Sequence, residues 1–307
     1  MRFLPSRSGL RSITHARAFL AAALVLAGCD TVTVVGPASQ TGPELPQTVA
    51  AAGGFDIVTT GVSPLPPSVE RALSEATTRW RSVVRGDLPD EQVDVPAGLC
   101  NVPHEAISRR VDDLLIFVEV NRIDGPGGAL ASAGPCMLRR GSRLPILGIV
   151  RVDSDDVARL AAADELSGVL LHEIGHVLGL GPLWEGLGQL SGAGSANPVH
   201  TGAHAIAEYR AAGGAEGPVP LENSGSIATR DVHWREAALG AEIMTGWINH
   251  HTRNPLSRVT VGALEDLGYV VDYSAADPFS ATAAGSQVLT GFTIEEVPAP
   301  PPRLSRF

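Results

Sequence analysis

Apolar runs and one amphipathic helix pattern organise the chain after residue 54. Residues 54–62 (GFDIVTTGV) have the composition of a strand. Residues 114–120 (LLIFVEV) and 147–152 (LGIVRV) are continuous apolar runs, which predict two buried strands. A helix is predicted over residues 66–84, because helical spacing places on one face Val69, Leu73, Ala76, Trp80 and Val83.

A second long helix is predicted over residues 161–180, where apolar residues recur with helical spacing. Between the two apolar strands we expect a Gly/Pro-rich loop around residues 124–136. Residues 153–155 (Asp-Ser-Asp) are typical of a turn that caps a helix. Gly179 suits the left-handed conformation in which many helices end. Strands and helices therefore alternate in this part of the chain.

The second helix contains the sequence HEIGH. An i, i+4 spacing places His172 and His176 one turn apart on the same face, so both imidazoles can bind one metal ion. Glu173 is next to the first of these ligands, where its carboxylate can reach a metal-held water. The pattern is typical of zinc peptidases, in which zinc lowers the pKa of water to about 7 and a carboxylate acts as base.

A catalytic zinc site usually has three protein ligands and a water. Many sites of this kind have a third histidine six residues after the second one, but here that position is Pro182, which cannot bind a metal. The motif alone leaves the third ligand open. The candidates downstream are His200, His204, His233, His250 and His251, or, in a zinc peptidase with a glutamate ligand, Glu185, Glu208 and Glu222.

The N-terminus has the features of a secretory signal. Several arginines precede a short apolar stretch over residues 18–26, which is too short to span a bilayer as a stable helix. The sequence Leu-Ala-Gly-Cys that follows ends at Cys29 and resembles the bacterial lipobox. We therefore expect residues 1–28 to be removed, and the exported protein to be anchored to the bacterial cell envelope by lipid on Cys29. Residues 29–54 read as a flexible tether.

Export of the protein would allow the other two cysteines to form a disulfide. An oxidising compartment favours pairing of Cys100 with Cys136, and neither cysteine lies in a CxxC pattern that would suggest a zinc ligand. The net charge of −10 and the pI of about 5.3 argue against nucleic acid as the main partner.

Four segments together resemble the leishmanolysin-like metzincins, which are zinc peptidases with an insertion before a distant third histidine. The resemblance identifies His233 as the third zinc ligand beside His172 and His176, and Met244 as the methionine of the tight turn below the metal. One departure is Gly246, where some metzincins have a tyrosine. The four segments cover residues 112–128, 171–184, 233–246 and 254–279.

The resemblance implies an α+β fold of the metzincin type and one zinc ion. Residues 55–181 would form an N-terminal subdomain with a twisted sheet, residues 182–282 a C-terminal subdomain with the Met-turn, and residues 283–307 a tail. The implied function is hydrolysis of peptide bonds with Glu173 as general base, on a peptide that extends along the sheet edge. The alternative is a catalytically inactive, zinc-containing surface module that binds envelope or host proteins.

Overall fold

The structure is a computed structural model that describes residues 54–249, 253–281, 291–293 and 303–304. The predicted signal peptide, Cys29 and nearly all of the tether lie outside these residues, as do His250, His251 and most of the predicted tail. None of the helices in the described ranges combines the length and the apolar character needed to cross a membrane.

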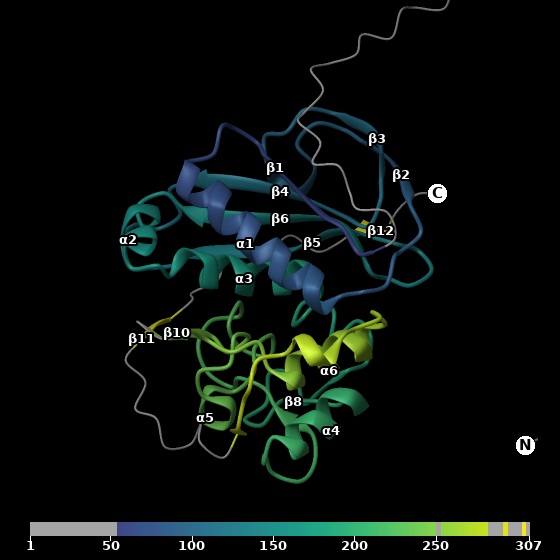
Figure 1. The fold of residues 1–307 in the computed structure, drawn as a ribbon, viewed down its shortest axis with the longest axis vertical. Coiled ribbons are helices and arrows are strands. Elements are labelled where there is room, and N and C mark those ends of the chain that lie inside the picture. The colour runs from purple at the N-terminus through teal and green to yellow at the C-terminus, as the bar shows by residue number, and fades with distance from the viewer. Residues whose placement is uncertain (1–53, 250–252, 282–290, 294–302, 305–307) are drawn as a thin grey trace, which may run out of the picture. The chain divides into compact units, whose positions relative to one another are not determined.

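A five-stranded sheet is formed by four strands from the first half of the chain and one strand from near its C-terminal end (Figure 1). Its strand order is β1-β4-β6-β5-β12, and β5 runs antiparallel to β6 whereas the other pairs are parallel. The three apolar segments predicted as strands are confirmed as β1, β4 and β6. The strands of this sheet are β1 (Ile57–Gly61), β4 (Leu114–Asn121), β5 (Ala131–Leu138), β6 (Pro145–Asp153) and β12 (Arg303–Leu304).

Two helices cover one face of this sheet. The predicted first helix is confirmed as α1 (Pro67–Val83), which begins with proline at a position that needs no amide donor. α1 and α3 (Leu166–Val177) pack together and share a core with alternate residues of β4, among them Leu114, Ile116 and Val118. Because side chains alternate along a strand, the residues between these three face the other side.

The opposite face of the sheet packs against an antiparallel pair of strands, and a disulfide links this region to the sheet. β2 (Glu91–Val95) and β3 (Ile107–Val111) pair antiparallel, and their buried valines pack with Leu115 and Phe117. The predicted disulfide between Cys100 and Cys136 is present in this smaller core, with the two Cα atoms 5.5 Å apart. It ties the segment after β2 to strand β5.

Replacing both Cys100 and Cys136 by serine should lower the free energy of unfolding by about 3–4 kcal/mol in the chain-entropy model, because the bridge spans 36 residues. Urea denaturation of the oxidised parent and the double variant measures this difference. Reduced parent protein is the control, and it should unfold at the urea concentration of the variant. A double variant as stable as the oxidised parent would contradict the prediction.

The predicted long helix over residues 161–180 is interrupted, which corrects that prediction. α2 (Val157–Ala162) ends before Asp164, whose φ of 60° is incompatible with a continuing right-handed helix, and α3 begins only at Leu166. The end of α3 is as expected, because Gly179 has a φ of 108°, and the amides of Gly179 and Leu180 donate back to the last turn.

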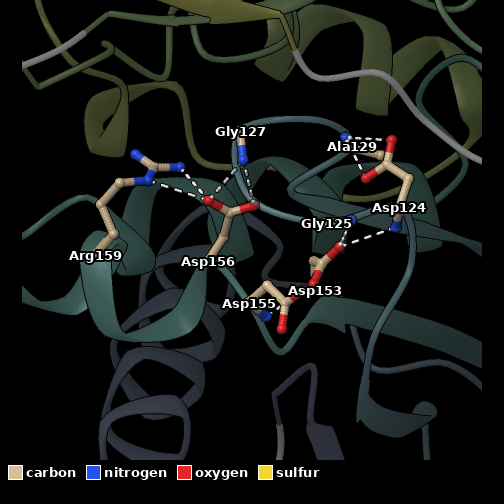
Figure 2. A network of polar contacts seen from close by, with 8 residues as sticks. All are labelled: Asp124, Gly125, Gly127, Ala129, Asp153, Asp155, Asp156 and Arg159. Atoms are coloured by element: carbon tan, nitrogen blue, oxygen red, sulfur yellow. Dashed lines mark hydrogen bonds and ion pairs between the residues drawn. The ribbon is translucent and has the colours of Figure 1, made fainter.

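The loop between β4 and β5 is shorter than predicted and is held by aspartates (Figure 2). β5 already begins at Ala131, inside the expected loop. Asp153 does not cap a helix; it accepts hydrogen bonds from the amides of residues 123, 124 and 125 at 3.1–3.2 Å. Burial opposes the charge of Asp153, but backbone hydrogen bonds outweigh it and hold its pKa below the usual value. Asp156 and Asp124 bind amides further along the same loop.

The elements after α3 are short, apart from two helices that pack together. Residue Ser257 caps α6 with its hydroxyl, and Gly268 ends it in the left-handed conformation. The subdomain boundary predicted at residue 181 stays a prediction. These elements are β7 (Leu190–Ser191), β8 (Val199–His200), α4 (Ala203–Ala211), β9 (Val219–Pro220), α5 (Glu236–Leu239), β10 (Trp247–Asn249), α6 (Arg258–Leu267) and β11 (Gly291–Thr293).

Candidate metal centre

Helix α3 is fixed against α1 and the sheet by close contacts. Trp80 of α1 donates its indole N–H to the carbonyl oxygen of Leu171 at 2.8 Å. Gly148 in β6 lies so close to Val177 that a side chain at this position would collide with the valine. These contacts hold in place the turn of α3 that carries the histidines.

The structure brings together three of the histidines that the sequence offers as ligands. His172 and His176 come from α3, and His233 precedes α5. Their Nε2 atoms are 2.9 Å apart between His172 and His176, 3.1 Å between His176 and His233, and 3.2 Å between His172 and His233. Three nitrogens on a tetrahedral ion at 2.0–2.1 Å would be separated by about 3.4 Å, so the spacing fits one metal ion.

The other ring nitrogens show why these Nε2 atoms are suited to a cation. Each Nδ1 lies 2.7–2.8 Å from a backbone carbonyl, which can only accept, so each Nδ1 carries a hydrogen and donates it. This leaves the three Nε2 atoms facing one another, and they are the nitrogens that could bind a cation. The carbonyl partners are Ile243 for His172, Leu180 for His176 and Thr229 for His233.

Glu173 lies beside these histidines on α3 and is fully buried, as are all three of them. The structure therefore places the predicted base in the same small region as the predicted ligands.

A loop anchored by Glu222 positions His233. One carboxylate oxygen of Glu222 accepts from the amides of Asn223 and Ser224 and from the Ser224 hydroxyl, and the other accepts from the amide of Glu236. Burial opposes the charge, but these donors hold the pKa of Glu222 below its usual value. Glu222, considered as an alternative ligand, thus shapes the loop that carries His233.

Met244 lies in a tight turn under α3. The amide of Thr245 donates to the carbonyl of Glu242, which closes the turn. A Cβ atom at Gly175 would be only 2.6 Å from the Met244 sulfur, so the glycine lets the methionine pack directly against the helix between His172 and His176. Met244 is fully buried there.

Two further buried glutamates surround this turn. Burial is the main cause that raises the pKa of Glu236 to about 7; a hydrogen bond with Thr245 lowers this pKa, and the nearby carboxylates of Glu222 and Glu242 raise it. Burial likewise raises the pKa of Glu242, against hydrogen bonds from Thr260, Met244 and Ser257. Both groups thus bind a proton more readily than exposed glutamates do.

The other candidate ligands within the described residues lie elsewhere. His200 is buried between the rings of Trp184 and Trp234, and His204 is half exposed beside Glu265. Glu185 is exposed on the surface, and Glu208 pairs with Arg258. Sequence reasoning missed the roles of Glu242 and of Gly175, although a glycine inside a helix pattern is a signal of close packing.

A sequence model described as leishmanolysin matches residues 87–296, more than half of the chain. The match spans the HEIGH motif, His233 and Met244. Among curated proteins, none matches the chain significantly. The mixed arrangement of a sheet and several helices also fits this family. The resemblance seen in the sequence is confirmed, and the chain belongs to the leishmanolysin family of metallopeptidases.

Proposed function

We propose that the protein is a zinc-dependent endopeptidase in which His172, His176 and His233 hold the ion. The observation that carries this proposal is the convergence of three Nε2 atoms, each fixed by an Nδ1–H bond to a backbone carbonyl, in a chain of a zinc-dependent family. A structural zinc site usually has four protein ligands, whereas three ligands leave a position for substrate or water.

In this proposal Glu173 is the general base. It takes a proton from the attacking water and passes it to the leaving amine, so the same carboxylate serves both halves of the reaction. When bound, zinc supplies a Lewis acid that polarises the scissile carbonyl. Met244 corresponds to the Met-turn residue, and its side chain provides an apolar floor under the two ligands of α3.

A cavity of about 490 Å³ is lined by neighbours of the site residues but not by the three histidines or Glu173, and we propose that it accepts a substrate side chain. Leu171 and Ile243 line it, and both are close to His172: the first precedes it, and the carbonyl of the second bonds to it. Charged residues line another part of the wall, including Arg79 and Arg253. The cavity therefore offers both apolar and ionic contacts to a substrate.

The peptide backbone of the substrate would lie extended along β5, which has only β12 on its outer side among the described strands. β12 pairs with the last two residues of β5, Met137 and Leu138. Added strands of this kind bind through main-chain hydrogen bonds. Export and anchoring by lipid on Cys29 complete the proposal, and they are supported by the sequence of the N-terminus.

Removal of the metal tests the proposal directly. The purified protein should contain about one zinc ion per chain, lose peptidase activity on dialysis against a chelator, and recover it when one equivalent of zinc is returned. Casein and a quenched peptide library serve as substrates, and zinc is counted by elemental analysis. Protein that holds zinc but cleaves neither substrate would support the inactive surface module instead, and protein without zinc would contradict the proposed site.

A further inference from the structure

Glu242 is a fully buried carboxylate to which four groups donate hydrogen bonds. Its Oε2 accepts from the amide of Met244 at 2.6 Å. Its Oε1 accepts from the amide and the hydroxyl of Ser257 at 3.1 and 2.7 Å, and from the hydroxyl of Thr260 at 2.6 Å. Ser257 and Thr260 belong to the cap and first turn of α6, so this carboxylate joins that helix to the turn below the metal centre.

One of these bonds leads to a metal ligand through a single peptide group. The amide that donates to Glu242 is the N–H of Met244, and the carbonyl of the same planar peptide belongs to Ile243. That carbonyl accepts the Nδ1–H of His172 at 2.7 Å. The peptide is thus held between the carboxylate of Glu242 on its N–H side and the imidazole of His172 on its C=O side.

A second branch leads toward the neighbour of another ligand. Thr260 accepts the indole N–H of Trp234 at 2.8 Å and therefore donates its own hydroxyl hydrogen to Glu242. The backbone amide of Trp234, the residue after His233, also donates to the carbonyl of Met244 at 3.0 Å. Glu242 thus contacts the turn directly and the segment of His233 through one side chain.

We propose that Glu242 is a positioning residue for the metal ligand His172, acting through the Ile243–Met244 peptide. Histidine ligands are often oriented by a carboxylate that accepts the second ring N–H directly. Here the Ile243–Met244 peptide group lies between the carboxyl group of Glu242 and the imidazole of His172. Hydrogen bonds in a chain polarise one another, so the bond that Glu242 accepts from the Met244 N–H makes the Ile243 carbonyl a stronger acceptor for Nδ1–H. The His172 ring is then held with its Nε2 toward the metal.

The test compares Glu242→Gln with Asp113→Asn, since both changes turn a buried carboxyl group that accepts backbone amides into a carboxamide of the same size. Asp113 is also fully buried and binds the amides of Asp56 and Leu88 at 2.6 Å each, but it lies in the turn before β4. Zinc affinity is measured by competition with a chromophoric chelator, and visible absorption of the cobalt-substituted protein reports the geometry around the metal. Circular dichroism checks the fold of each variant.

Glu242→Gln should bind zinc about 10–100-fold more weakly than the parent and shift the cobalt absorption bands. Asp113→Asn should lower the unfolding temperature but leave both metal readouts unchanged. Equal zinc affinity in Glu242→Gln and the parent would overturn the inference, and so would an equal loss in Asp113→Asn, which would indicate general loosening.

If Glu242→Gln does not fold, Ser257→Ala takes its place, because it keeps the Glu242 carboxyl group and removes one of its four donors, together with the hydroxyl that caps α6. Ser257→Ala should also weaken zinc binding, but by a smaller factor than the one expected for Glu242→Gln. A zinc affinity equal to that of the parent would overturn the inference. The inference rests on the proposed function, but different experimental results would contradict the inference and the proposed function. A parent that binds no zinc overturns both, whereas a parent that binds zinc and a Glu242 variant that binds it equally well overturn this inference alone.

Discussion

Glu173→Gln should lower peptidase activity by about 10²–10⁴-fold while the zinc content stays at the parent level. Glutamine keeps the size of the side chain, so the buried space beside the histidines stays filled, but the amide cannot take a proton from water. Because the three imidazoles are unchanged, metal affinity should not fall with activity. The measurement is kcat/KM on a quenched peptide together with zinc content by elemental analysis.

Glu208→Gln is the matched control for this variant. Glu208 is a carboxylate on α4 that pairs with Arg258, so its loss affects an ion pair outside the metal centre. This control should keep both zinc and activity. A Glu173→Gln protein that cleaves peptides as fast as the parent would show that another group is the base.

His233→Ala should weaken zinc binding by more than the 10–100-fold typical of a change in a group behind a ligand, because it removes one of three protein ligands. Activity should disappear with the metal. The measurement is zinc retained after mild chelation, followed by peptide hydrolysis with and without added zinc. His204→Ala is the control, since His204 is a partly exposed histidine on α4 with 53% of its side chain accessible.

A particular outcome would change the ligand assignment. If His233→Ala retains zinc as tightly as the parent, the third ligand is another residue, and the convergence of the three Nε2 atoms would not reflect the metal-bound protein. A loss of zinc in His204→Ala would point to the segment around α4 instead.

The helical part of the site was predictable because its information is local. Apolar periodicity identified the helix around His172 and His176, and Gly179 marked its end. The same periodicity could not show the interruption at Asp164, because the apolar spacing of α3 extends back across a residue with left-handed backbone. β5 was missed for a related reason. It is a buried strand of small residues without alternation, and Gly134 and Pro135 within it resemble a loop.

The non-local part of the site could not be derived from spacing. His233 follows His176 by 57 residues, and only the folded chain shows that it, and not His200, faces the two ligands of α3. The resemblance to a family supplied this residue, while the burial of Glu242 and its four donors had no counterpart in the sequence pattern. A glutamate among Ala, Ile and Met is equally compatible with a solvated turn.

The same separation of 57 residues fixes when the three histidines can first come together during synthesis of the chain. A chain that has been synthesised only as far as α3 contains His172, Glu173 and His176. It does not yet contain His233 or Met244. Every competent active centre therefore requires the later segment to return to a helix made much earlier. If the proposed function holds, an incomplete chain would not cleave peptides, because hydrolysis would have to wait until the segment with His233 and Met244 has been made and has folded back.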